Sequence, residues 1–225
     1  MSFSKQKALF PFWLKLSAVI YLAVFISVYW VLQGPVNFLW FSDIAFIVVV
    51  ITLWLEKPLP ASMMAVGVML FELGRILDFL FRLIMGHHLF GLDATRYMFT
   101  PELPFVIKLL SFSLYVILPL LLVYVFHKLG YDRRAWKAQT ILAWIVLPVC
   151  YFFTDPALNI NWVFGIGGQQ TLATGPVYLI SGMIVLPFLV YYPVHRLLIW
   201  IFYRIGNNMA KELVYSPALL RLVIV

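Results

Sequence analysis

Six long apolar stretches, separated by short polar connections, constrain this chain more than any other feature of its sequence. Each stretch approaches the ~20 residues that an α-helix needs to cross the hydrocarbon core of a bilayer. The composition agrees, since 64% of the 225 residues are hydrophobic and only 11% are charged, whereas roughly a quarter of the residues in soluble domains are charged. The spans are expected near residues 16–33, 37–55, 59–85, 104–127, 138–154 and 174–193.

These stretches predict an all-α, polytopic membrane protein, with residues 1–225 forming one transmembrane domain of six helices. Pro119, Pro148 and Pro187 each interrupt one of the predicted spans. Because proline lacks the N–H that the helix needs, we expect the bundle to be kinked at these positions.

The distribution of Lys and Arg between the spans predicts the orientation. Basic residues occur before the first span, between the second and third, between the fourth and fifth, and after the sixth, whereas the opposite side has Arg96 alone. Loops rich in Lys and Arg stay in the cytoplasm. We therefore expect a multi-pass protein of the cell inner (cytoplasmic) membrane with both termini in the cytoplasm. Residues 194–225 then form either a cytoplasmic tail or a basic helix lying in the interface.

Four ionisable side chains occur inside the third span, where one unpaired charge costs about 2.5 kcal/mol or more. They are Glu72, Arg75, Asp78 and Arg82. Spacings of three and four residues place them on one helix face as a ladder of alternating charge, in the outer half of the membrane. We interpret the ladder as the wall of a functional cavity. The alternative is a set of ion pairs that only holds the helices together.

Further polar residues are expected at the same depth as this ladder. Asp43 lies near the outer start of the second span, and Lys108 lies at the outer end of the fourth. The outer loop before the sixth span contains Asn159, Asn161 and Trp162, followed by glycines. This pattern predicts either a re-entrant lid over the cavity or an interfacial turn anchored by Trp162.

These residues together predict an outer-leaflet polar cavity for an amphipathic, lipid-like ligand. A basic side chain there can bind a phosphate or carboxylate head group, and a carboxylate can act as a general base. The candidate catalytic residues are Asp43 and Glu72. The candidate ligand-binding residues are Arg75, Asp78, Arg82, Lys108, Asn159, Asn161 and Trp162. The reaction would be lipid-linked transfer or hydrolysis. The alternative is a non-catalytic transporter, or a lipid-binding accessory subunit of a membrane complex.

Several other classes of site and partner are not expected. His87 and His88 are adjacent and do not share a helix face, so a pair of loop residues is favoured over a metal site. The single cysteine, Cys150, is interpreted as packing. No cofactor is expected. No nucleic-acid partner is expected either, because the basic residues follow the membrane topology. The expected partners are membrane lipids, with a second copy of the chain or a membrane complex as further possibilities.

The layout of the spans resembles that of uncharacterised bacterial inner-membrane proteins. The resemblance lies in the aspartate of Asn37-Phe-Leu-Trp-Phe-Ser-Asp43 and in Asn159-Ile-Asn-Trp162 before the sixth span. More remotely, the layout resembles the YwaF-like six-helix family, whose eukaryotic relative is described as a phospholipid acyltransferase that uses a cysteine and a histidine. The resemblance covers most of the chain and implies a six-helix membrane fold. It carries no catalytic role to Cys150, because no matching pair of cysteine and histidine motifs occurs in this sequence.

Overall fold

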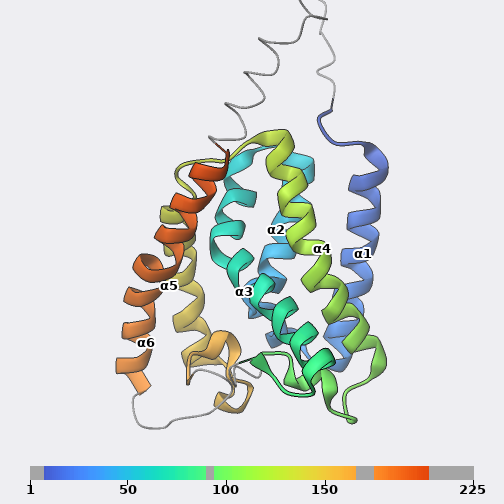
Figure 1. Ribbon diagram of the computed structural model, residues 1–225, viewed down its shortest axis with the longest axis vertical. Helices are drawn as coiled ribbons and strands as arrows, with labels where there is room; N and C mark the ends of the chain where they lie inside the picture. Colours follow the sequence, from blue (N-terminus) through green and yellow to red (C-terminus); the bar gives the residue numbers. More distant parts are fainter. Residues whose placement is uncertain (1–7, 90–93, 166–174, 203–225) are drawn as a thin grey trace, which may run out of the picture.

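The computed structural model describes residues 8–89, 94–165 and 175–202. Six α-helices run side by side, and no β-strand occurs in this part of the chain (Figure 1). The helices are α1 (Phe12–Leu32), α2 (Phe41–Leu55), α3 (Pro58–Met85), α4 (Phe105–Leu129), α5 (Ala135–Phe153) and α6 (Gly175–Val185). After α6 the chain continues through the π-helix η7 (Leu186–Tyr191), and the helix runs on to Phe202, the last residue that the structure describes. Short 3₁₀-helices lie in the connections: η1 (Pro35–Leu39), η3 (Arg96–Phe99), η4 (Pro156–Leu158) and η5 (Ile160–Trp162).

Four of these helices are long and apolar enough to cross a membrane. They are α1, α4, α5 and the continuous helix Gly175–Phe202. Large apolar side chains, such as Val31, Leu83 and Phe188, are exposed on the outward faces of the bundle. In a membrane protein, lipid tails contact such faces, whereas contact of so much apolar surface with water is unfavourable. The expected all-α architecture is confirmed, and these helices indicate a multi-pass membrane protein.

The two remaining helices differ from this pattern for separate reasons. α2 has 15 residues, which gives a length of about 22 Å, shorter than a ~30 Å hydrocarbon core. α3 has 28 residues, or about 42 Å, but it carries the four charges of the predicted ladder. Glu72 lies at the middle of α3, and the other three charges follow toward the end where α3 joins α4. We call this side of the bundle the loop end.

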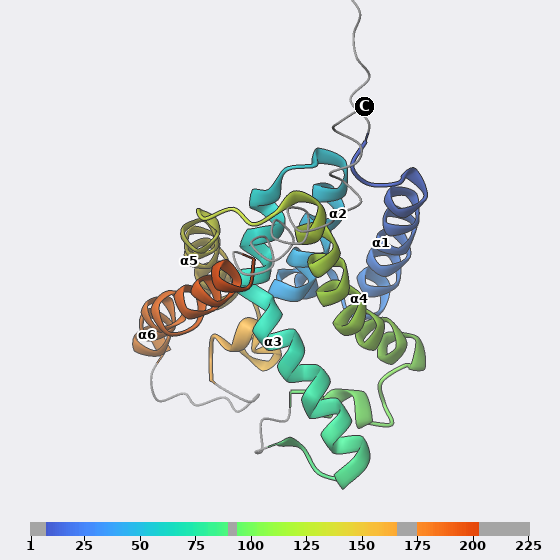
Figure 2. The same cartoon turned by 45° about the horizontal axis from the view of Figure 1, so that its top comes forward.

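α3 is the central helix of the bundle. It packs against α2, α4 and α5, while α1 packs on α2 and α6 packs on α5 (Figures 1 and 2). Small buried residues, Ala61, Ala65 and Gly67, form the closely packed first half of α3, where they let neighbouring helices approach. The side chain of Gln139 on α5 lies directly against Gly67, in space that a Cβ atom would occupy.

The sixth span departs from a regular helix at the proline predicted to disturb it. Pro187 has no N–H, so the carbonyl of Met183, four residues earlier, loses its helical partner. The indole Nε1 of Trp144 on α5 donates to this carbonyl at 2.8 Å. The helix is locally π-helical from Leu186 to Tyr191. Pro119 and Pro148 instead lie inside α4 and α5, which continue past them.

The ends of some helices differ from the ends of the predicted spans. The first helix begins at Phe12, directly after Pro11, rather than at residue 16. The second begins at Phe41 rather than at residue 37, because Gly34, with a φ of 82°, starts a separate 3₁₀-helix over Pro35–Leu39. The sixth continues to Phe202 instead of ending at residue 193. The interfacial helix considered for the C-terminal tail lies almost wholly outside the described residues.

Candidate functional site

Two cavities meet beside the middle of α3. The apolar cavity, of about 390 Å³, is lined mainly by α3, α5 and the helix Gly175–Phe202. The polar cavity, of about 580 Å³, is lined by α1, α2, α4 and the loops at the loop end. Both volumes fall in the range of small-molecule sites. The residues that line both cavities are Trp40, Ser42, Arg75 and Trp162. Arg75 is therefore the charged group at the junction.

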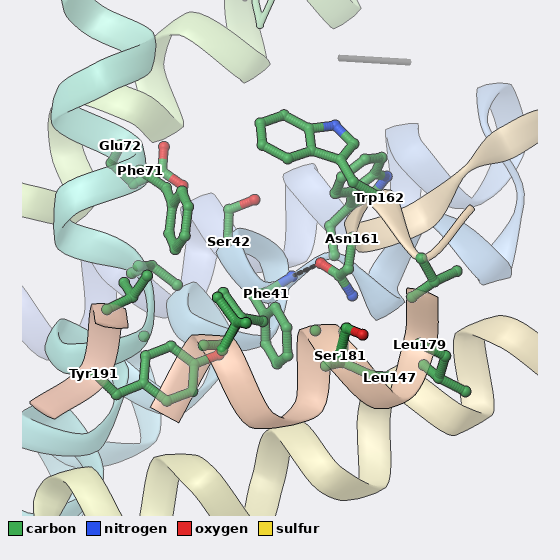
Figure 3. A pocket seen from close by; sticks show the side chains of 18 of the residues that line it. Phe41, Ser42, Phe71, Glu72, Leu147, Asn161, Trp162, Leu179, Ser181 and Tyr191 are labelled. Carbon is green, nitrogen blue, oxygen red and sulfur yellow. Dashed lines mark hydrogen bonds between the residues drawn. The ribbon is translucent and has the colours of Figure 1, made fainter. Parts of the chain in front are cut away.

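Glu72 and Arg75 form the buried ion pair of the site. Nη1 of Arg75 donates to Oε1 of Glu72 at 2.8 Å and to Oγ of Ser42 at 3.2 Å. Glu72 is 1% exposed, and its Oε2 has no hydrogen-bond partner among the described residues. Figure 3 shows Ser42 between Glu72 on one side and Asn161 and Trp162 on the other. One carboxylate oxygen is therefore occupied and the other is left unpartnered in the wall of the apolar cavity.

Asp43 lies in the wall of the polar cavity, in the first turn of α2. The partial positive charge of a helix N-terminus favours a carboxylate at this position. Asp43 is 4% exposed, and its Oδ2 accepts one long hydrogen bond, of 3.3 Å, from the amide of Asn37. No other side chain or backbone group among the described residues donates a hydrogen bond to the Asp43 carboxylate. The carboxylate therefore keeps most of its accepting capacity.

Aromatic hydroxyl groups line the rest of the polar cavity. Tyr29 on α1 bonds to Ser111 on α4, and Tyr97 in η3 bonds to Tyr115 on α4. Burial raises the pKa of Tyr97 above its ordinary value, so its phenol stays protonated at neutral pH. The guanidinium carbon of Arg75 lies 5.2 Å from the centre of the Tyr115 ring, a distance at which the ring stabilises the cation.

The predicted ladder is formed only at its first pair. Beyond Arg75, the carboxylate of Asp78 turns to the connection between α3 and α4. It accepts hydrogen bonds from the backbone N–H groups of Leu89 and Thr95, from the Thr95 hydroxyl and from His88 Nδ1, at 2.6–3.0 Å. Four donors hold a buried carboxylate more firmly than a pair of i,i+3 and i,i+4 contacts. Asp78 thus anchors a loop instead of pairing with Arg75 and Arg82.

Two more basic candidates also lie away from the cavities. The guanidinium of Arg82 stacks 5.6 Å from the centre of the Phe99 ring, and Nζ of Lys108 donates to the carbonyl of Thr100. In the part of the chain that the structure describes, neither Arg82, Lys108 nor Asp78 lines either cavity. Of the basic residues predicted to bind a ligand, the structure brings Arg75 alone to the cavities.

The loop that contains Asn159, Asn161 and Trp162 forms part of the cavity wall. These residues have positive φ angles of 41°, 52° and 57°, a region that asparagine tolerates better than most residues. The Asn159 side chain bonds to the backbone of Phe164 and Gly165, within the loop.

Asn161 fastens this loop to the start of α2. Its Oδ1 accepts from the N–H of Phe41 at 3.0 Å, and its Nδ2 donates to the carbonyl of Leu39 at 2.7 Å and to Sγ of Cys150 at 3.4 Å. Both asparagine side chains are thus used by the protein itself. Trp162 presents its ring to both cavities.

His88 and Cys150 bind other side chains of the protein. His88 binds Asp78, and the buried Cys150 accepts from Asn161. No group of three or more histidine, cysteine or acidic residues within the ranges 8–89, 94–165 and 175–202 is arranged to hold a metal ion.

The aromatic lining of the polar cavity was not predicted from the sequence. Trp40, Tyr29, Tyr97 and Tyr115 belong to this lining. Tyr29 and Tyr115 lie within apolar spans, where a phenol must find a polar neighbour. That requirement was the available signal, although it does not name the partner.

Comparison of the chain with protein families, with curated proteins and with solved structures gives no match. The layout-level resemblance to the YwaF-like family stays a prediction. The function is therefore inferred from the chemistry of the two cavities.

Proposed function

We propose that the chain is a six-span protein of the inner membrane that binds an amphipathic, lipid-like ligand at Arg75. In this proposal α2 and α3 complete the set of spans, and both termini lie in the cytoplasm, as the distribution of Lys and Arg predicts. The phosphate or carboxylate of the ligand lies against Arg75, and its hydrocarbon tail lies in the apolar cavity.

The position of Arg75 at the junction of a polar and an apolar cavity is the observation that carries this proposal. An amphipathic molecule needs these two environments side by side, with a charged group where they meet. Arg75 uses Nη1 for Glu72 and Ser42, while its Nε and Nη2 make no hydrogen bond to any described residue. A guanidinium with two such N–H groups can bind a phosphate through both.

The walls of the apolar cavity suit a hydrocarbon chain. Val68 on α3, Leu147 on α5 and Leu179 on α6 contribute to its lining, and the cavity is partly open to the outside. Each CH₂ group that leaves water for such a site contributes about 0.8 kcal/mol. A tail can therefore supply much of the affinity, while Arg75 selects the head group.

The test compares lipid binding by Arg75→Gln, Arg75→Lys and the control Arg82→Gln, which changes a basic residue on the same helix outside both cavities. A charge-assisted hydrogen bond contributes about 1.5–3 kcal/mol, so Arg75→Gln should weaken the binding of phosphatidic acid about 10- to 100-fold. Native mass spectrometry of delipidated protein with added lipid measures this change. Equal binding by Arg75→Gln and Arg82→Gln would remove the proposal.

A second candidate function is lipid-linked transfer or hydrolysis, with Asp43 or Glu72 as the general base. It is supported by the unpartnered Oε2 of Glu72, because a base needs an oxygen that is free to take a proton. Glu72→Gln should then bind lipid but fail to convert a labelled lipid pool. If Glu72 serves packing alone, as in an accessory subunit, the same change should lower the melting temperature and leave lipid turnover absent in both proteins.

A further inference from the structure

One acid at the junction has no ion-pair partner among the described residues. The charged groups there are the buried acids Asp43 and Glu72 and the part-buried base Arg75. Arg75 forms its ion pair with Glu72, and no basic side chain in the described part of the chain forms one with Asp43. An unpaired buried charge is costly unless a counter-charge or several hydrogen-bond donors accompany it.

Asp43 has little of this compensation from the protein. Asp43 is only 4% exposed, and it lines the polar cavity. Among the described residues, its carboxylate accepts one hydrogen bond, of 3.3 Å, from Asn37. Asp78, by comparison, accepts four bonds from its loop. The space in front of Asp43 therefore suits a group that donates hydrogen bonds and carries positive charge.

The other walls of the polar cavity also favour a cation. Trp162 contributes an aromatic side chain to these walls, as do Trp40 and Tyr115, whose ring centres also lie 6.0 and 5.2 Å from the guanidinium carbon of Arg75. Aromatic rings stabilise ammonium groups, and cages of them are a known means of binding such ligands. Arg96 also lines this cavity, but it is exposed, where water screens its charge.

We propose that the ligand head group is zwitterionic, as in an aminophospholipid, with its phosphate bound by Arg75 and its ammonium bound by Asp43. This inference rests on the proposed function, since it assigns the phosphate to the same arginine. It adds that Asp43 is the residue that selects the head group. Phosphate and ammonium are close together in phosphatidylethanolamine. Arg75 and Asp43 line one cavity, and Arg75 binds Ser42, the residue before Asp43.

The experiment measures competition between lipids with identical acyl chains. Delipidated protein is mixed with equal amounts of phosphatidylethanolamine, phosphatidylglycerol and phosphatidic acid, and native mass spectrometry counts each bound lipid. The wild-type chain should prefer phosphatidylethanolamine. Asp43→Asn should reduce its binding about tenfold, the effect of losing one charge-assisted interaction, and should leave phosphatidic acid nearly unchanged. Asp43→Glu should retain the preference, and Glu102→Gln, an exposed acid outside both cavities, serves as the control.

Three results would overturn this inference and leave the proposed function standing. These are equal binding of the three lipids, a preference for phosphatidylglycerol, which has hydroxyl donors but no ammonium, or equal losses of all three lipids in Asp43→Asn. If Arg75→Gln does not weaken the binding of any of the three lipids, the proposed function itself is wrong. If Asp43→Asn does not fold, the wild-type competition and Asp43→Glu still decide the matter.

Discussion

Asn161 is the most informative single residue for testing how the cavity wall is held. It links the loop before α6 to the start of α2 through the N–H of Phe41 and the carbonyl of Leu39. Asn161→Ala removes both bonds, at about 1 kcal/mol each. It also places alanine at a φ of 52°, which costs about 1–2 kcal/mol. The free energy of unfolding should therefore fall by about 3–4 kcal/mol in total.

Asn161→Gly separates the two contributions, because glycine removes the side chain but accepts the positive φ. Each kcal/mol corresponds to about 2–4 °C in a chain of this size. Asn161→Ala should thus lower the Tm of purified protein in detergent by roughly 10 °C, and Asn161→Gly should lower it by about two thirds as much. Should Asn161→Ala melt within about 2 °C of the wild type, the loop is not fastened as described.

Two further changes test the packing of α3 in the wall of the apolar cavity and an ion pair at the end of the bundle opposite the loop end. Gly67→Ala places a Cβ in the space of the Gln139 amide and should destabilise the protein by about 1–3 kcal/mol; adding Gln139→Ala should restore the Tm, and failure to restore it would contradict the proposed clash. At the end of the bundle opposite the loop end, the hydrogen bond from Lys15 lowers the pKa of Glu56 below its ordinary value of 4.5. The Glu56 carboxylate therefore stabilises the fold fully at a pH above 4.5. This contribution is lost as the pH falls through the lower pKa of the folded state. Between neutral and acidic pH, the Tm should fall less steeply with pH for Glu56→Gln than for the wild type. An equally steep fall would show that the contact between Lys15 and Glu56 is not formed.

The helices were largely predictable because the signal for a span is local. Each needs a run of apolar residues about as long as the bilayer is thick, and such a run can be read without knowing its neighbours. The start of α2 was less predictable, since Val36, Phe38 and Leu39 already begin the apolar stretch that the helix continues. The continuation of the last helix to Phe202 lies beyond the predicted span, because the span length was set by the thickness of the hydrocarbon core, which a helix can exceed.

The site was less predictable because its bonds join distant parts of the chain. Asp78 and Thr95 are 17 residues apart, and Tyr29 and Ser111 are 82 residues apart. Helical spacing favoured pairing Asp78 with its neighbours on α3, and no local pattern shows that a loop offers it better donors. The pairing of Glu72 with Arg75 was predictable, because its i,i+3 spacing is contained in one helix.

A cryo-EM structure of the protein in nanodiscs of bacterial lipid tests the central claim most directly. The account predicts phosphate density within hydrogen-bonding distance of the Arg75 guanidinium and an acyl chain that continues from it into the apolar cavity. Lipid density confined to the outer surface of the bundle, with Arg75 contacting only water or acyl chains, would contradict it.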